Sequence, residues 1–474
     1  MKQQRLTFLH TNDSHSSFEQ ELRLGSLIRR RRAELRAEGV PVLLVDGGDH
    51  VDMSVLECMA TDGQLNLDLH AALAYDAAGV GNNELMRFSL ERVRELSLSS
   101  QVPWLLANLR EQDGSLIGGM RESLLLDAGG VQVGFVGITD QVGTTYEEFV
   151  GLQNTDTVTT VREIATNLRA AGADLIVVLS HAGLNQDLAL APQWTGLVDV
   201  IVGAHTHDAL HEPQLESGVW IVQAGAYARL LGELHLELDL DAPAGQKIVT
   251  ATGQLLPVEA DEAPDAELAA IYQLAVAHVE KKMSEVLTTL EAPLSHDRLI
   301  QELATTMREF YGVELGMMFG AVAVEGFPAG PVTVGDVLRN LQSLVNVSKI
   351  EFQGQQLLGL LYERNDPAYY ARIKFGNGIR PKSGVPVGRI FFDGLTWDEQ
   401  EGAITNVRVN GEPLEHDRWY TVGGGEHLAH VETLYYPSLA GAKLLHVDDY
   451  YYVKDAFVAY LRQSNVQTEQ EVSS

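Results

Sequence analysis

Short apolar runs alternate with amphipathic segments through the first half of the chain. The runs have the length of strands, and the segments between them carry apolar residues at helical spacing. The predicted strands are 6–10, 42–45, 103–107, 131–136, 175–179, 198–202 and 220–222, and the predicted helices are 22–38, 63–77, 90–97 and 159–171. The strictly alternating segment 234–240 predicts one more strand, buried on one face. This alternation predicts an α/β domain.

A polar, proline-containing segment at 260–265 precedes a long helical pattern over 266–287, and we expect the domain linker there. The region beyond it mixes both kinds of signal again. Predicted helices cover 299–311, 334–341 and 355–361, and predicted strands cover 345–352, 388–392 and 403–409. We therefore expect a first domain over 1–260, a linker helix over 261–290 and a smaller α/β domain over 291–465.

Composition narrows the class of protein. With 474 residues, 45% of them hydrophobic, the chain is too long for one ordinary domain. A net charge of −31 disfavours nucleic acid and anionic membranes as partners, and no apolar run approaches the roughly 20 residues of a membrane span. Cys58 is the only cysteine, and no signal peptide is visible after Met1, so we expect a cytoplasmic protein.

Side chains of metal-ligand type follow the predicted strands of the first domain. Because the carboxyl ends of strands in an open α/β sheet share one edge, such residues can converge from distant parts of the chain. An Asp-x-His pair or a His-x-His pair on an extended segment also places two side chains on one side. Each of these pairs or single residues alone is weak evidence for metal binding, but their joint occurrence at strand ends favours a metal site. The candidates are Asp13, His15, Asp49, Asn82, His181, His205 and His207.

These residues lie in blocks that resemble the five blocks of the calcineurin-like metallophosphoesterases, and the 5'-nucleotidase branch in particular. The blocks are Thr11-Asn12-Asp13-Ser14-His15, Gly48-Asp49, Gly81-Asn82-x-Glu84, Ser180-His181 and Gly203-Ala204-His205-Thr206-His207. Segments 106–109, 328–336 and 420–422 are similar to that branch as well. The resemblance implies an N-terminal β-sandwich flanked by helices and a smaller C-terminal α/β substrate-binding domain.

The resemblance also implies two divalent metal ions that share Asp49. One ion would be held by Asp13, His15, Asp49 and His207, and the other by Asp49, Asn82, His181 and His205. Manganese, zinc, iron and cobalt all suit such ligands. The implied function is hydrolysis of phosphate esters of nucleotides or related small molecules by a metal-bridging hydroxide.

Two features depart from the family's pattern. Asn83 stands where the family has a histidine, and an amide cannot supply a proton to a leaving group. His50, next to Asp49, is a candidate replacement acid, although a histidine in a loop is more often a bystander. The second departure is the glycine-rich stretch 320–326, which lacks the arginine with which the family helps to hold its substrate.

Candidate substrate-binding residues in the second domain are Asn346, Phe375, Tyr435 and Tyr436, although aromatic residues in such positions more often belong to the core. Three alternatives to a nucleotide phosphatase stay open. One is a pyrophosphatase or nucleotide-sugar hydrolase, the second is a cyclic phosphodiester hydrolase at the same site, and the third is a nucleotide-binding sensor with little turnover.

Overall fold

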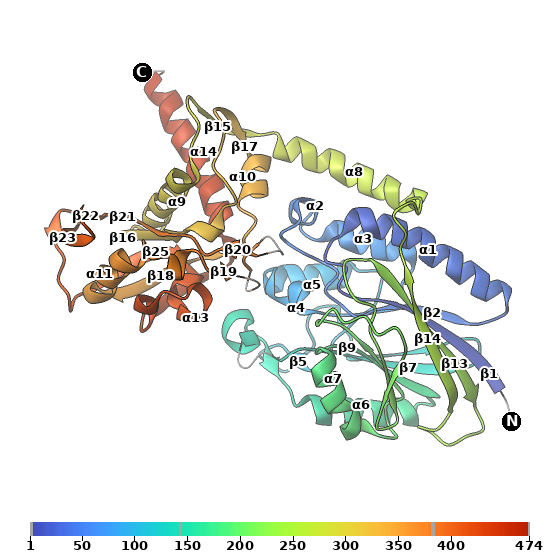
Figure 1. The fold of residues 1–474 in the computed structure, drawn as a ribbon. Coiled ribbons are helices and arrows are strands. Elements are labelled where there is room, and N and C mark those ends of the chain that lie inside the picture. Colours follow the sequence, from blue (N-terminus) through green and yellow to red (C-terminus); the bar gives the residue numbers. More distant parts are fainter. Residues whose placement is uncertain (1–2, 142–144, 375, 377, 381–383, 473–474) are drawn as a thin grey trace. The chain divides into compact units, whose positions relative to one another are not determined.

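The computed structural model describes residues 3–141, 145–374, 376, 378–380 and 384–472, and the chain divides into two compact units (Figure 1). The units are Met1–Ala277 and His278–Ser474. The division falls inside helix α8 (Ala266–Met283), so this helix contributes to both units.

The first unit contains two six-stranded sheets. In one sheet the strands follow the order β14 (Ile248–Pro257), β13 (Leu230–Asp239), β1 (Gln3–Thr11), β2 (Val42–Asp46), β3 (Ala77–Gly79) and β4 (Trp104–Leu105). In the other the order is β11 (Gln214–Glu216), β12 (Val219–Val222), β10 (Val200–Gly203), β9 (Leu175–His181), β7 (Gln132–Thr139) and β6 (Ser123–Asp127). Strands β1, β2 and β3 run parallel, as do β7, β9 and β10, so each sheet gathers several carboxyl ends at one edge.

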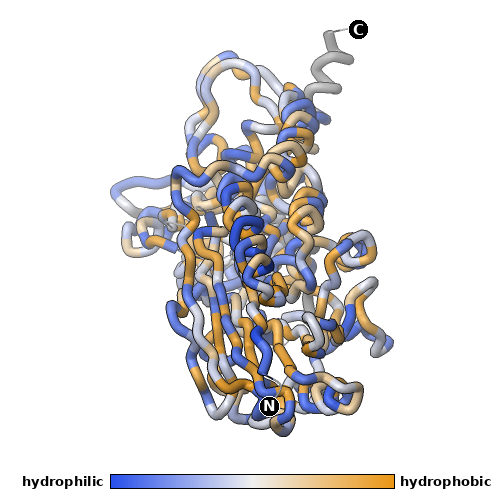
Figure 2. The backbone as a smooth tube through the Cα atoms, turned by 90° about the vertical axis from the view of Figure 1, so that its right-hand side faces the viewer, coloured by the Kyte–Doolittle hydropathy of each residue, from blue (hydrophilic) through white to orange (hydrophobic). Residues whose placement is uncertain are grey.

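The two sheets pack face to face over one apolar core. Phe8 of β1 and Phe135 of β7 are fully buried there, with ring centroids 6.2 Å apart in an edge-to-face arrangement. Figure 2 shows hydrophobic positions recurring along the strands. Burial of each such side chain contributes about 1.5–3 kcal/mol, so the sandwich interior is the main source of stability for this unit.

Helices flank the sandwich (Figure 1). Helix α1 contacts β2 and β13 of the first sheet, and α6 contacts β7 and β9 of the second. The helices of this unit are α1 (Phe18–Ala37), α2 (Leu56–Ala60), α3 (Gln64–Leu73), α4 (Asn82–Met86), α5 (Leu90–Ser99), α6 (Thr157–Ala170) and α7 (Leu184–Leu190). The predicted β-sandwich flanked by helices is thus confirmed.

The second unit is a smaller α/β structure, also as predicted. Its five-stranded sheet has the order β21 (Ile390–Asp393), β16 (Leu315–Phe319), β25 (Trp419–Gly425), β18 (Asn346–Gln353) and β26 (Lys443–Tyr452). Its helices include α9 (His296–Tyr311), α10 (Val334–Asn340), α11 (Gly354–Glu363), α12 (Pro367–Tyr370), α13 (Val431–Leu434) and α14 (Val453–Val472). Shorter strands are β15 (Val286–Leu290), β17 (Gly330–Thr333), β19 (Ile373–Lys374), β20 (Val385–Pro386), β22 (Leu395–Gln400), β23 (Ala403–Val409) and β24 (Glu412–Pro413).

Some element boundaries differ from the sequence-based prediction. The predicted helix 63–77 ends at Leu73, because Ala74 takes the left-handed conformation (φ 51°) and the chain then joins the first sheet as β3. The predicted helix 266–287 ends at Met283, because the next residues pair with β17 as strand β15. In both cases the helix ends early because the residues after it pair with another strand, β3 with β2 and β15 with β17.

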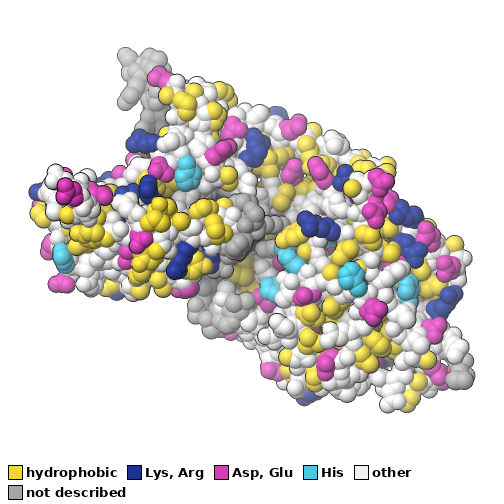
Figure 3. Space-filling model, viewed as in Figure 1, with side chains coloured by type: hydrophobic (Ala, Val, Ile, Leu, Met, Phe, Trp, Pro, Cys, Tyr) yellow, Lys and Arg dark blue, Asp and Glu magenta, His cyan; other side chains and the backbone are white. Residues whose placement is uncertain are grey.

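None of the helices in the described part of the chain is both long and apolar enough to span a bilayer. On the face shown in Figure 3, acidic side chains are scattered over both units rather than gathered in one patch. This distribution is that of a solvated surface.

Candidate metal centre

The candidate metal ligands of the first unit lie at or just after the carboxyl ends of its strands; His181 ends β9 and Asn82 begins α4. Most of them have a left-handed backbone, which is uncommon for residues other than glycine. The residues concerned are Asp13 (φ 51°), His15 (φ 49°), Asp49 (φ 55°), His205 (φ 72°) and His207 (φ 60°). Such strain clusters at sites where the surrounding structure must hold side chains in defined positions.

The first group of side chains comes from the loop after β1 and from the His-x-His segment. The Nε2 atoms of His15 and His207 lie 3.1 Å apart. Oδ1 of Asp13 lies 3.4 Å from Nε2 of His207 and 3.8 Å from Nε2 of His15. These atoms converge on one point although they are separated by almost 200 positions in the sequence.

The second group adjoins the first. Oδ2 of Asp49 lies 3.4 Å from Nε2 of His181 and 3.9 Å from Nε2 of His15, so it faces both groups. Nδ1 of His205 lies 2.9 Å from Oδ1 of Asn82. Asp13 also belongs here by distance, because its Oδ1 is 3.9 Å from Nε2 of His181.

Neighbouring groups orient these ligands. Oδ2 of Asp13 accepts hydrogen bonds from the side chain of Asn12 (2.7 Å) and the backbone N–H of His205 (2.9 Å). Nδ1 of His181 lies 3.0 Å from the carbonyl oxygen of Gly47, a partner that leaves Nε2 as the lone-pair nitrogen. Bonds of this kind fix the tautomer and direction of a metal ligand.

The arrangement fits divalent cations. Ligands about 2.1 Å from one ion lie about 3 to 3.5 Å apart, which matches the shorter separations in both groups. Oδ1 of Asp13 and Nε2 of His181 are buried and have no hydrogen-bond partner in the part of the chain that the structure describes. Buried polar atoms are costly when left unpaired, and a bound cation would satisfy both. The pKa of Asp13 is lowered, because His207, His181 and His15 together outweigh the opposing effect of burial.

Glu84 joins the loop that carries the candidate ligand Asp49 to the one that carries Asn82, a role that the sequence did not reveal. Its buried carboxylate accepts hydrogen bonds from the backbone N–H groups of Gly81 (2.7 Å), Asp49 (2.9 Å) and Val51 (3.1 Å). Nδ1 of His50 lies 3.1 Å from Oε1 of the same carboxylate. Burial acts to raise the pKa of Glu84, but His50 and these bonds lower it well below its usual value.

The two candidate catalytic residues lie in different surroundings. The side-chain amide of Asn83 is 2.9 Å from Nδ1 of His15, and its backbone N–H donates to Oδ1 of Asp49 at 2.8 Å. His50 is fully buried, and its ring packs against His70 (centroids 4.5 Å apart) and Trp104 (5.4 Å). Asn83 thus contacts candidate ligands directly, whereas His50 contacts Glu84.

Tyr227 also adjoins the site and was not predicted. Its ring lies against the rings of His15 (centroids 5.5 Å apart) and His207 (5.3 Å), and the guanidinium of Arg229 lies 5.5 Å from its centroid. Its backbone N–H donates to the carbonyl oxygen of Asp13 at 2.7 Å. No motif marks Tyr227, which lies in the loop between β12 and β13.

The candidate substrate-binding residues lie in the second unit. Tyr435 has a left-handed backbone (φ 65°), and cations from Arg372 (5.0 Å) and Lys374 (5.5 Å) lie over its ring. Tyr436 is fully buried, and its hydroxyl donates to the carbonyl oxygen of Gly388 at 2.8 Å. Asn346 begins β18, and Phe375 lies outside the described residues.

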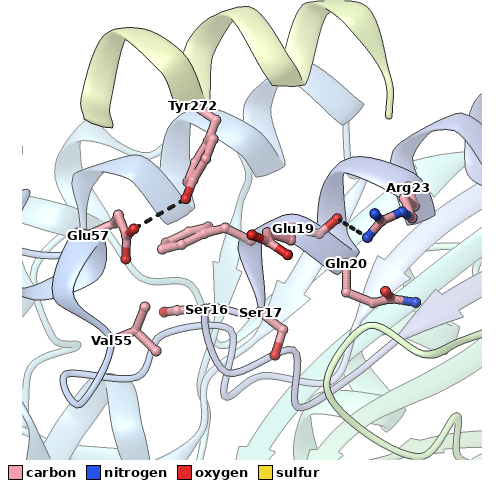
Figure 4. A pocket seen from close by; sticks show the side chains of 9 residues that line it. Ser16, Ser17, Glu19, Gln20, Arg23, Val55, Glu57 and Tyr272 are labelled. Atoms are coloured by element: carbon pink, nitrogen blue, oxygen red, sulfur yellow. Dashed lines mark hydrogen bonds between the residues drawn. The ribbon is translucent and has the colours of Figure 1, made fainter. Parts of the chain in front are cut away.

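A cavity of about 360 Å³ opens next to the loop that carries His15 (Figure 4). It lies between the start of α1, the region of α2, and α8, from which the hydroxyl of Tyr272 bonds to Glu57 at 3.2 Å. Its wall contains the carboxylates of Glu19 and Glu57, and its arginine, Arg23, bonds to the carbonyl oxygen of Glu19 at 3.3 Å. This mixed charge does not favour a phosphate.

Comparison with known proteins supports the same class. Residues 6–209 match the calcineurin-like phosphoesterase family, and residues 275–436 match the 5'-nucleotidase C-terminal domain. Metallophosphoesterase YunD of Bacillus subtilis (strain 168) is 27% identical over 88% of this chain and 91% of its own length. The 5'-nucleotidase of Vibrio cholerae serotype O1 is 23% identical over 88% of this chain and 83% of its own. A crystal structure of a putative 5'-nucleotidase from Staphylococcus aureus, in complex with alpha-ketoglutarate, has a similar fold, with a TM-score of 0.67 and 17% identity over 96% of each chain.

A helix-flanked β-sandwich with candidate aspartate and histidine metal ligands at its strand ends, together with the family match, defines a metal-dependent phosphoesterase. The second unit carries the companion domain that the family comparison names. The chain belongs to the calcineurin-like metallophosphoesterases with a 5'-nucleotidase C-terminal domain, a family of hydrolytic enzymes.

Proposed function

We propose that the protein hydrolyses phosphate monoesters of nucleotides or related small molecules at a centre of two divalent ions. The position of Asp49 is the main support. Its Oδ2 faces Nε2 of both His15 (3.9 Å) and His181 (3.4 Å), as a carboxylate shared by two ions would.

The proposed ligand groups follow from the two clusters. Asp13, His15, Asp49 and His207 would hold one ion, and Asp49, Asn82, His181 and His205 the other. Ions bound there would lower the pKa of a bound water and neutralise charge on the phosphoryl oxygens. The loops that present these ligands are joined by Glu84 and held in left-handed conformations, so the chain pre-organises the site for a phosphate dianion.

We propose a positioning role for Asn83. When Nε2 of His15 binds an ion, Nδ1 carries the proton, and the amide of Asn83 then presents its oxygen as the acceptor. The burial of His50 between Glu84 and His70 favours a supporting role for His50 over that of an acid facing the substrate. The proton for the leaving group would then come from water.

Substrate recognition by the second unit is part of the proposal. Tyr435 is the better candidate of the two tyrosines, because Tyr436 is fully buried. The cations of Arg372 and Lys374 over the Tyr435 ring would favour an anionic substrate. The single, buried Cys58 is compatible with the cytoplasmic location expected from the sequence.

The test is a substrate panel with manganese, zinc, iron or cobalt added to metal-free protein. The panel contains a nucleoside monophosphate, p-nitrophenyl phosphate, a nucleotide sugar, pyrophosphate and a cyclic phosphodiester, with Asp49→Asn as the matched inactive variant. We expect turnover of the monoesters by the wild type and loss of turnover in Asp49→Asn. Nucleotide binding without turnover of any compound would identify a sensor and overturn the proposal.

A further inference from the structure

A second cavity, of about 320 Å³, adjoins the candidate metal centre at the carboxyl ends of β7 and β9. Thr139, the last residue of β7, pairs in register with His181, the last residue of β9. Thr139 lines the cavity together with the residues that follow the two strands, Asp140 and Ala182, and the wall includes His205. A group held at the metal centre therefore has this cavity beside it.

The base of the cavity is rigid. Both amide atoms of the buried Asn108 bond to the backbone of Thr139, with Nδ2 donating to its carbonyl oxygen at 2.8 Å and Oδ1 accepting from its N–H at 3.0 Å. Gln141 is tied down as well, because its Nε2 donates to the carbonyl oxygen of Thr155 at 2.8 Å. A cavity with pre-ordered walls loses little entropy when it binds a ligand.

Asp140 provides the cavity with a hydrogen-bond acceptor. The residue is 6% exposed, and its Oδ1 accepts from the hydroxyls of Tyr146 (2.8 Å) and Thr139 (3.2 Å). Its Oδ2 is buried and has no hydrogen-bond partner among the described residues. A buried carboxylate oxygen without a donor is costly, so a ligand that brings a hydroxyl or N–H group would be stabilised there.

The charge of the wall restricts the ligand further. The described lining contains neither lysine nor arginine, and Asp140 is its carboxylate, beside polar Thr157 and Gln186 and apolar Leu190. A second phosphate would be repelled there and would lack a cation to pair with. A neutral group with several hydroxyls matches a wall of one carboxylate, two side-chain amides and two threonine hydroxyls.

We propose that this cavity binds the neutral, hydroxyl-rich part of the substrate, with a hydroxyl donating to Oδ2 of Asp140 while the phosphoryl group occupies the metal centre. This inference rests on the phosphomonoesterase function proposed above. It selects phosphate esters of sugars and other polyols over substrates whose leaving group is itself a phosphate.

The test compares three probes in wild type and variants. The probes are glucose 6-phosphate, p-nitrophenyl phosphate, which has no hydroxyl to offer, and inorganic pyrophosphate. Asp140→Asn retains the shape of the side chain and still accepts from Tyr146, but it lacks the negative oxygen. We expect this variant to raise KM for glucose 6-phosphate at least about tenfold, and to leave p-nitrophenyl phosphate hydrolysis within about twofold.

Two further variants separate an effect of the cavity from a general effect of losing a carboxylate. Leu190→Trp fills the cavity without touching Asp140 chemistry, and we expect the same selective rise in KM. Asp113→Asn, at an exposed carboxylate that bonds only to nearby Ser115, is the matched control and should behave as wild type. Equal effects on glucose 6-phosphate and p-nitrophenyl phosphate in both cavity variants would overturn the inference.

Failure of the inference and failure of the proposed function give different results. If the wild type hydrolyses p-nitrophenyl phosphate but favours pyrophosphate over glucose 6-phosphate, the function stands and the cavity assignment is wrong. If no probe is hydrolysed, the function is wrong. Calorimetric titration of glucose 6-phosphate into metal-loaded wild type and Asp140→Asn then tests the cavity directly, and equal affinities would refute it.

Discussion

The side-chain amide of Asn83 lies 2.9 Å from Nδ1 of His15, so the residue that replaces the family's histidine contacts a candidate metal ligand on the ring nitrogen that faces away from Asp13. Its backbone N–H bonds in addition to Oδ1 of Asp49 at 2.8 Å. One residue therefore touches candidate ligands of both ions. These contacts agree with the positioning role proposed for Asn83.

Substitutions of Asn83 should therefore change metal affinity. We expect Asn83→Leu to weaken binding at the His15 side by about tenfold or more, because outer partners of ligating histidines typically contribute that much. Asn83→Asp should bind metal at least as tightly as the wild type, because a carboxylate is a stronger acceptor for Nδ1–H. Titration with cobalt, followed by its visible absorption, measures both. Unchanged affinity in Asn83→Leu would show that the contact does not position His15.

Removal of the Glu84 carboxylate should destabilise the first unit strongly. Glu84→Ala leaves three backbone N–H groups and the buried His50 without their acceptor, a loss of roughly 3–5 kcal/mol for a broken buried ion pair. Denaturant unfolding of the metal-free protein measures the change. The control is Glu262→Ala, whose partner Arg30 is on the surface, and it should cost less than about 1 kcal/mol. Similar losses of unfolding free energy in both variants would show that Glu84 does not hold the two loops together.

Asp187 should make stability depend on pH. Burial raises its pKa to about 7 from 3.8, and its Oδ2 has no hydrogen-bond partner among the described residues. The folded chain therefore keeps this proton up to about pH 7, whereas the unfolded chain releases it near pH 4, so the contribution of Asp187 to stability falls as the pH rises between these values.

Asp187→Asn should remove this dependence. Its amide oxygen can still accept from Ser180, and its NH₂ faces the same space over Gly203 as the unpaired Oε1 of Gln223. We expect the variant to be more stable than the wild type at pH 8 by roughly 1–3 kcal/mol, and to lose that advantage near pH 4. Thermal unfolding in chelator at pH 4 to 8 checks this. A constant difference across the range would exclude Asp187 as the titrating group.

A chain that ends at Ala277 should fold and bind metal. All candidate ligands and both six-stranded sheets lie in Met1–Ala277, so neither the core nor the site is cut. Circular dichroism and metal analysis of this fragment provide the measurement, with Asp49→Asn in the same fragment as the control. A fragment that is unfolded, or folded without metal, would show that the second unit is needed to complete the first.

The alternation of apolar strands and amphipathic helices predicted an α/β domain, and the resemblance of its motifs to the family predicted the sandwich. The candidate ligands could be named because they follow the predicted strands. The sequence could not reveal Tyr227, because this residue lies in the loop that connects β12 of one sheet to β13 of the other and no motif marks it. It also placed a strand over 103–107, of which only β4 (Trp104–Leu105) forms, because Leu106 and Ala107 continue in a loop. The contact of Asn83 with His15 depends on loop geometry, which residue spacing does not determine.

The properties of Cys58 allow introduced cysteines to be labelled selectively. It is the only cysteine, it is fully buried, and burial raises the pKa of its thiol to about 12, so reagents that attack thiolates will find it inert. New cysteines at exposed positions, such as Leu98 in the first unit and Val324 in the second, would therefore be labelled selectively in an otherwise natural chain. A pair of spin labels at these positions would allow the distance between the two units to be measured with and without metal and substrate.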